Sequence, residues 1–219
     1  MVQTLLINTS NLLWKDVEMY LHLLNASEAK QIISIRHEKS RIASLMGRLI
    51  LLYYLKKNKI LIGSKITSIS YTECGKPYLS EQKLNFSISH SNNYVGCTFS
   101  LNSNIGLDIE YMNDIDICEY KSVFGKDEYS YLMSNQSLYA FYLLWTRKES
   151  FLKAIGAGFL LQPQNINTLE NPIIYEKYQF YTKSWNICGN YLMTIASANL
   201  NQYKTDILEL DNLCSVLNY

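Results

Sequence analysis

The sequence has almost no net charge and no long apolar run. Lys and Arg number 20 and Asp and Glu number 19, which leaves a formal net charge of +1 in 219 residues. No overall field therefore attracts nucleic acid or an anionic membrane, and an anion site needs a local group of cations. The longest apolar run, residues 49–55, is far below the roughly 20 residues of a membrane helix. With no secretory signal at the start, we predict a cytoplasmic protein that binds neither nucleic acid nor membrane.

Metal-binding cysteine pairs are also absent. The five cysteines are scattered without a Cys-x-x-Cys pair, and the chain has only three histidines. This pattern fits buried thiols in a reducing compartment and argues against a disulfide framework or a zinc site. The remaining composition, 48% hydrophobic and 18% charged, favours packed structure over disorder.

Hydrophobic periodicity divides the chain into alternating helical and strand-like parts. Residues 27–58 and 127–155 have apolar side chains at helical spacing, whereas 66–110 and the part after residue 163 contain short strand-like runs. The order of helix, strands, helix, strands predicts an α+β protein with two similar α/β lobes, residues 1–115 and 116–219. No residue-level repeat relates the halves, so the order of elements alone supports this division.

Two acidic residues share one face of a predicted strand. In residues 105–110, Ile-Gly-Leu-Asp-Ile-Glu, the strand period of two puts Asp108 and Glu110 on the same side as Gly106, opposite three aliphatic side chains. We expect Gly106 to leave room for a ligand. Such a pair of carboxylates indicates either a solvated outer face or a divalent-cation site, and the strand alone does not decide between them.

A third carboxylate belongs to the second predicted helix. Trp145, Glu149 and Lys153 recur every four residues and therefore lie on one helical stripe. Glu149 and Lys153 form either an exposed ion pair, or a metal-binding acid beside a phosphate-binding cation. Gly156 and Gly158 are expected to end this helix and to permit close approach of neighbouring backbone.

The remaining polar candidates precede the acidic strand. Lys76 stands in a Gly-Lys-Pro turn, which restricts its position, and Ser89 and His90 end a short strand, where they can donate hydrogen bonds to phosphate oxygens. The first helical segment is the most cationic part of the chain and includes Arg41 and Arg48. For most of these cations a solvated helix face is the simpler interpretation.

Taken in order, these motifs resemble the signature of 4'-phosphopantetheinyl transferases of the surfactin-synthetase (Sfp) type. The family pattern is a hydrophobic-Gly-hydrophobic-Asp strand followed, further along the chain, by Trp-Ser/Thr-x-Lys-Glu-Ser/Ala and a final Lys. Here residues 105–108 read Ile-Gly-Leu-Asp, and 145–153 read Trp-Thr-Arg-Lys-Glu-Ser-Phe-Leu-Lys. The turn at 75–77 and the segments 86–91 and 124–132 are similar too.

The resemblance implies a fold and a reaction. In this family two similar lobes, related by a pseudo-twofold axis, hold coenzyme A between them. Phosphopantetheine moves from coenzyme A to a serine hydroxyl of an apo acyl or peptidyl carrier protein, and 3',5'-ADP is released. By resemblance, Asp108, Glu110 and Glu149 bind Mg²⁺ together with the pyrophosphate of coenzyme A. Three carboxylates offer the hard oxygen ligands that magnesium prefers.

The resemblance also implies contacts to coenzyme A. Lys76, Ser89, His90 and Lys153 match positions that hold its phosphates and its adenine end. Glu149 would take the proton from the carrier serine, directly or through a water molecule. Lys153 would offset the charge on the leaving 3',5'-ADP.

Four further expectations concern the ligand, the partner, the alternative functions and the oligomeric state. An arginine on the first long helix should contact the 3'-phosphate of coenzyme A, and we place Arg41 slightly ahead of Arg48. An acidic carrier protein should dock on a hydrophobic groove with a basic rim near residues 124–132 and the junction of the lobes. A noncatalytic coenzyme A-binding protein that docks carriers, or a metal-dependent phosphohydrolase, stays open. Both lobes come from one chain, so we expect a monomer.

Overall fold

The computed structural model describes residues 1–61, 69–80, 82–156 and 161–217. The first elements are β1 (Val2–Asn8), α1 (Trp14–Val17), the 3-10 helix η1 (Glu18–Leu23), α2 (Ala26–Ile33), α3 (Glu38–Lys57), β2 (Ile69–Tyr71), β3 (Pro77–Leu79), β4 (Asn85–Ser91) and β5 (Tyr94–Ser100). They are followed by β6 (Ile105–Tyr111), η2 (Ile117–Tyr120), α4 (Lys126–Asn135), α5 (Leu138–Ile155), η4 (Pro163–Asn165), β7 (Ile173–Tyr175), β8 (Tyr178–Asn186), β9 (Tyr191–Ser197), β10 (Tyr203–Leu208) and α6 (Leu210–Leu217).

The predicted helical and strand-like parts are found at nearly the predicted places. The segment 27–58 holds two helices, α2 and α3, and the segment 127–155 holds α4 and α5. The predicted start of β2 at residue 66 lies outside the described residues. The elements that were not predicted are β1, α1, α6 and the 3-10 helices η1, η2 and η4. In the described parts of the chain, no helix has the length and apolarity needed to cross a membrane.

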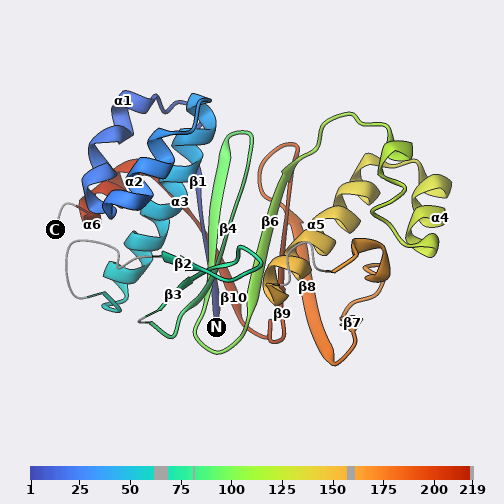
Figure 1. Ribbon diagram of the computed structural model, residues 1–219. Coiled ribbons are helices and arrows are strands. Elements are labelled where there is room, and N and C mark those ends of the chain that lie inside the picture. Colours follow the sequence, from blue (N-terminus) through green and yellow to red (C-terminus); the bar gives the residue numbers. More distant parts are fainter. Residues whose placement is uncertain (62–68, 81, 157–160, 218–219) are drawn as a thin grey trace.

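Two four-stranded sheets pack face to face, and each has a long helix on its outer side (Figure 1). Their strand orders are β10-β1-β5-β4 and β6-β9-β8-β7. On the first sheet, Tyr54 of α3 stacks on Phe99 with ring centroids 3.8 Å apart. Between the sheets, Leu6 packs with Leu107 and other aliphatic side chains of the second sheet. This helix–sheet–sheet–helix arrangement confirms the predicted α+β fold with two similar lobes.

The sheets do not divide the chain at residue 115. Strand β6 belongs to the second sheet, where it pairs with β9. Strand β10 returns to the first sheet and pairs with β1 in parallel, and Leu213 of α6 joins the core beneath α3. The division into lobes of residues 1–115 and 116–219 remains a prediction. The sheets do not follow it, because β6 from the first segment joins the second sheet. Conversely, β10 and α6 from the second segment join the first sheet and its core.

The edges of the two sheets meet along β4 and β6. No backbone pairing joins these strands among the described residues. Serine hydroxyls of β4 instead accept hydrogen bonds from alternate N–H groups of β6. The pairs, with donor–acceptor distances, are Leu107 N to Ser87 Oγ at 3.1 Å, Ile109 N to Ser89 Oγ at 3.2 Å, and Tyr111 N to Ser91 Oγ at 3.0 Å. The repeating serines of β4 therefore satisfy edge N–H groups that would otherwise lack acceptors.

Gly106 makes room for helix α5, not for a ligand. A Cβ atom added at Gly106 would lie 1.9 Å from the carbonyl oxygen of Ser150 and 2.6 Å from the amide nitrogen of Ala154. The expectation of a ligand at this glycine was therefore wrong, since the helix backbone fills the space. The same close contact places the acidic face of β6 directly against α5.

Gly106→Ala should destabilise the protein strongly. Because the new Cβ would overlap backbone atoms that cannot rotate away, we expect urea denaturation to show a loss of at least about 3 kcal/mol, the upper end of the usual overpacking range. Gly189→Ala is the matched control. Gly189 has no atom within 4 Å of an added Cβ and a φ of +55°, so only the left-handed backbone cost of about 1–2 kcal/mol applies. Equal losses in the two variants would contradict this account of Gly106.

Candidate active site

Helix α5 turns its predicted stripe toward the acidic face of β6. Lys153 Nζ lies 2.7 Å from Asp108 Oδ1, and Trp145 Nε1 donates to Glu110 Oε1 at 3.1 Å. Glu149 lies between Trp145 and Lys153 on the same stripe of α5. The charges of Asp108 and Lys153 both affect its pKa. The structure thus brings all three predicted acids and Lys153 together, and Lys153 pairs with Asp108.

Asp108 is a buried carboxylate with one unsatisfied oxygen. Its exposed fraction is 3%. Oδ1 accepts hydrogen bonds from Lys153 Nζ and, at 3.2 Å, from Ser89 Oγ, whereas Oδ2 is buried without a partner. Burial raises the pKa of Asp108, although Lys153 and Ser89 act in the opposite direction. An unsatisfied buried carboxylate oxygen is costly, which suggests that it has a ligand during function.

Glu110 and Glu149 complete the acidic face. Glu110 is held by Trp145 and by Ser91, whose hydroxyl donates to Oε2 at 3.1 Å. Burial, and then the negative charge of Asp108, raises the pKa of both glutamates. Asp108 therefore opposes ionisation of both glutamates, a repulsion that a bound cation would relieve.

Lys153 is the cation closest to these acids. Burial lowers its pKa, but the carboxylates of Asp108, Glu149 and Glu110 raise it by more, so the net shift is upward. The ammonium group therefore stays charged at neutral pH. Besides Asp108, Lys153 Nζ contacts Ser89 Oγ at 3.2 Å.

The donor set fits a hard divalent cation in its chemistry. This set contains the unpartnered oxygen of Asp108 and the carboxylates of Glu110 and Glu149, whose ionisation the charge of Asp108 opposes. Mg²⁺ prefers such oxygen ligands. Within the described ranges, however, no three acidic, cysteine or histidine side chains are close enough to enclose a metal ion. Lys153 supplies the positive charge beside Asp108.

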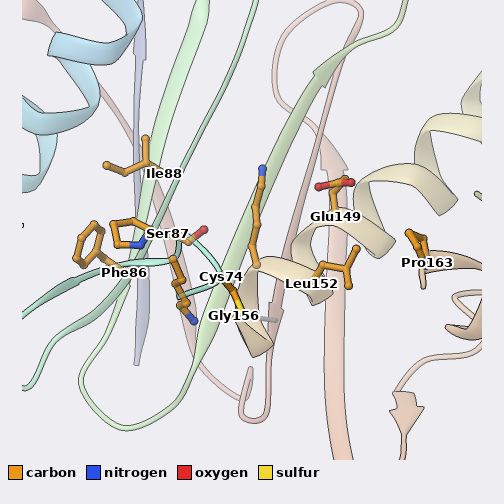
Figure 2. Close-up of a pocket in the computed structure, with 12 residues that line it drawn as sticks. Cys74, Phe86, Ser87, Ile88, Glu149, Leu152, Gly156 and Pro163 are labelled. Carbon is orange, nitrogen blue, oxygen red and sulfur yellow. The ribbon is translucent and has the colours of Figure 1, made fainter. Parts of the chain in front are cut away.

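A cavity of about 320 Å³ opens beside the acidic face (Figure 2). Its charged lining residues are Lys76, Glu149 and Lys153, and most of its other walls are apolar. Lys76 Nζ donates to the carbonyl oxygen of Ala154 at 2.7 Å, and burial lowers the pKa of Lys76 to about 8. The β2–β3 turn thus brings Lys76 from the first lobe onto the end of α5.

Gly156 ends α5 as predicted. It adopts a left-handed conformation with φ of +75°, and a Cβ there would lie 2.7 Å from Lys76 Cδ. We expected neighbouring backbone to approach this glycine closely. The side chain of Lys76 does so instead. Gly158 lies outside the described residues.

Ser89 and His90 lie next to the acids but differ in exposure. Ser89 is buried, and its hydroxyl is already bound to Asp108, Lys153 and the N–H of Ile109. His90 is exposed. Partial burial of the ring, and then the positive charges of Lys153 and Arg48, lower the pKa of His90.

The two candidate arginines occupy different places. Arg41 donates to the carbonyl oxygens of Ile35 and Arg36, and its guanidinium lies 5.0 Å from the ring centroid of Trp14. Arg48 donates to Tyr71 Oη at 3.1 Å and lies 3.5 Å from Glu28 Oε2. Of the two arginines, Arg48 has a positive charge that lowers the pKa of His90, and Arg41 does not contribute to this shift.

Two comparisons with known proteins identify the family. Residues 104–196 match the model of the 4'-phosphopantetheinyl transferase superfamily, and residues 13–100 match that of the 4'-phosphopantetheinyl transferase N-terminal region. The 4'-phosphopantetheinyl transferase gsp of Aneurinibacillus migulanus is 31% identical, over 97% of this chain and 95% of the relative. The chain belongs to the 4'-phosphopantetheinyl transferase superfamily. The resemblance found in its motifs is thereby confirmed.

Other relatives carry the same name. The 4'-phosphopantetheinyl transferase Sfp of Bacillus subtilis (strain 168) is 27% identical, over 84% of this chain and 87% of the relative. A mouse protein, L-aminoadipate-semialdehyde dehydrogenase-phosphopantetheinyl transferase, is 29% identical over 72% and 61%. The two family models meet between residues 100 and 104, just before β6, which agrees with the membership of β6 in the second sheet.

One hollow of this transferase near residues 124–132 is lined by acidic and not by basic charged residues. A hollow of about 250 Å³ between η2 and α4 includes Leu132 and Met133. Its charged lining residues are Asp114 and Asp116. Two acidic residues would repel an acidic carrier protein, so this hollow does not match the predicted docking surface.

A buried ion pair, which was not predicted, supports the acidic face of the transferase. Lys148 and Glu128 are each 1% exposed in their side chains, and Lys148 Nζ lies 2.8 Å from Glu128 Oε2. Lys148 also donates to the carbonyl oxygens of Pro163 and Ile166, and Glu128 Oε1 accepts from the N–H and hydroxyl of Thr168. The pair connects α4, α5 and residues 163–168. Lys148 directly precedes Glu149 in α5, so these contacts hold the helix next to the acidic face.

Lys148→Met should lower the free energy of unfolding by about 3–5 kcal/mol, because it leaves the Glu128 carboxylate buried without its cation. Urea denaturation measures the loss. The double variant Lys148→Met with Glu128→Leu should recover part of it, since no buried charge then remains. A double variant whose loss equals the sum of the two single losses would show that the two residues are not coupled.

Proposed function

We propose that this transferase moves 4'-phosphopantetheine from coenzyme A to a serine hydroxyl of an apo carrier protein, with release of 3',5'-ADP. The supporting observation is the contact between β6 and α5, where Asp108, Glu149 and Lys153 meet beside a cavity that also contains Lys76. Acids and cations beside a mainly apolar cavity suit a ligand such as coenzyme A, in which phosphates join a nucleoside to an organic arm.

The cations near the cavity are proposed to bind the phosphates of coenzyme A. Lys76 and Lys153 line the cavity itself. The charges of Lys153 and Arg48 both act on His90, so these side chains form one positive region. We therefore assign the 3'-phosphate contact to Arg48 in preference to Arg41. A direct contact of Ser89 with phosphate remains a prediction.

Glu149 is proposed to accept the proton of the carrier serine, directly or through a water molecule. Burial and the charge of Asp108 raise its pKa toward neutrality, which makes the carboxylate a stronger base. Lys153 stays charged and can stabilise the negative charge that develops on the departing 3',5'-ADP.

Asp108, Glu110 and Glu149 are proposed to hold Mg²⁺. When bound, the ion neutralises charge on the pyrophosphate of coenzyme A. Asp108 offers its unpartnered oxygen, while Trp145 and Ser91 fix the orientation of Glu110.

The acceptor is proposed to be an acyl or peptidyl carrier protein, and the enzyme is proposed to act as a monomer in the cytoplasm. Both lobes that border the cavity belong to one chain, so one copy can supply every proposed contact. The five cysteines are free thiols, which fits a reducing compartment, but the expectation that they are buried holds only for Cys97, since Cys118 and Cys188 are exposed.

Intact mass spectrometry of an apo carrier protein tests the reaction. After incubation with the enzyme, coenzyme A and Mg²⁺, the carrier should gain the mass of one phosphopantetheine. The gain should disappear with EDTA or with a carrier whose acceptor serine is alanine. Glu149→Gln should abolish the gain without loss of thermal stability, because burying an amide relieves repulsion between the acids.

Glu170→Gln is the matched control, since Glu170 is exposed and outside the site, and it should modify the carrier at the wild-type rate. A carrier that stays unmodified by wild-type enzyme that binds coenzyme A would favour a noncatalytic binding protein. Release of phosphopantetheine to water without an acceptor would favour a phosphohydrolase.

The affinity for acetyl coenzyme A should fall as the pH rises above about 8, because Lys76 has a pKa of about 8 in the free protein. A phosphate partner favours the charged ammonium, so binding takes up a proton above this pH, and Kd should rise by at most about tenfold per pH unit. Acetyl coenzyme A lacks a titrating thiol. Titration calorimetry between pH 7 and 9.5 measures the change.

Lys76→Arg is the control, since arginine stays charged throughout this range. Its Kd should be nearly independent of pH. A wild-type Kd that is equally independent of pH would remove Lys76 from the phosphate contacts.

A further inference from the structure

Each serine of β4 can make two kinds of hydrogen bond toward β6. Ser89 accepts the N–H of Ile109 and donates its own proton to Asp108. Ser91 accepts the N–H of Tyr111 and donates to Glu110. In both cases the serine therefore contacts two consecutive residues of β6: it donates to the side chain of the first and accepts from the backbone N–H of the second. A hydroxyl has one proton to donate, so both serines are committed.

Ser87 is the third member of this series and lacks the acidic partner. It accepts the N–H of Leu107 at 3.1 Å. The residue before Leu107 is Gly106, which has no side chain to receive the proton of Ser87. Among the described residues, no acceptor for this proton is found, although Ser87 is only 5% exposed. The Ser87 oxygen already has a partner in the N–H of Leu107, so its proton is left for a group that occupies the cavity.

Ser87 also lines the cavity beside the acidic face (Figure 2). Its neighbours there include the apolar side chains of Phe86, Ile88 and Leu152. Lys76 and Lys153 line the same cavity and supply positive charge. An apolar space with one buried donor and cations nearby matches a nucleotide, whose flat base has lone-pair nitrogens and whose phosphates are anionic.

We propose that Ser87 is a substrate-binding residue whose hydroxyl donates a hydrogen bond to a ring nitrogen of the adenine of coenzyme A. This assignment depends on the proposed function, because it takes coenzyme A as the ligand of the cavity. Ser87 then has a different task from Ser89 and Ser91, which orient the acids, although all three bind β6 in the same way.

Ser87→Ala tests the assignment through binding. Titration calorimetry should show a rise of about tenfold in Kd for adenosine 3',5'-bisphosphate and for coenzyme A, the effect of one lost hydrogen bond to a ligand. Binding of 4'-phosphopantetheine, which lacks the adenosine, should not change. KM for coenzyme A should rise by the same factor. Ser87→Thr, which restores a hydroxyl, should bring Kd back to within about threefold of the wild-type value.

Thr98→Val separates this role from a purely structural one. Thr98 is the cross-strand partner of Ser87, and its hydroxyl accepts a hydrogen bond from Thr4 in the buried interface outside the cavity. The variant should lose thermal stability while its Kd for adenosine 3',5'-bisphosphate stays unchanged. If Ser87→Ala likewise loses stability without a change in Kd, Ser87 only joins the lobes and the proposal is wrong.

Two further outcomes overturn the assignment in different ways. A weakened binding of 4'-phosphopantetheine, with unchanged binding of adenosine 3',5'-bisphosphate, would place Ser87 on the other end of the substrate. Absence of any binding of coenzyme A by the wild-type protein would instead refute the proposed function, and the role of Ser87 with it.

Discussion

The hydrogen bonds between the serines of β4 and the N–H groups of β6 join the two lobes. An edge strand carries N–H groups that need acceptors, and here hydroxyls provide them where backbone carbonyls would normally do so. Because Ser89 and Ser91 also donate to Asp108 and Glu110, the junction of the lobes and the orientation of the acids rest on the same atoms. Helix α5 can lie across this junction only because Gly106 has no side chain.

Helix α5 carries two adjacent charged residues, Lys148 and Glu149, in different environments. Lys148 is buried and its ammonium group has three acceptors, namely Glu128 and two backbone carbonyls. Glu149 points instead toward the cavity, where burial and Asp108 both oppose its ionisation. Lys148 thus connects parts of the second lobe, whereas the carboxylate of Glu149, the proposed base, lies where ionisation is disfavoured. A helix can separate the two tasks because successive side chains point about 100° apart.

Much of the acidic face was predictable, because it depends on local periodicity. The strand period placed Asp108 and Glu110 on one side, and the helical spacing placed Glu149 and Lys153 on one stripe. Which groups pair across β6 and α5 depends on tertiary contacts, so the bond of Lys153 to Asp108 was not predictable. Gly106 was misread, since a glycine serves a ligand and a neighbouring backbone equally well. Strand β10 is largely polar and takes its conformation from pairing with β1.

The parallel pairing of β1 with β10 gives synthesis of this chain a particular order of events. β1 leaves the ribosome first, but its neighbour on one side is made after the whole second lobe. Until then the first lobe has a bare strand edge, and α3 lacks the apolar cover that α6 provides. Such surfaces favour association with other chains while they are exposed. The lobe that begins the chain is therefore the last to be completed, and a chain that stops before residue 203 is defective at its beginning.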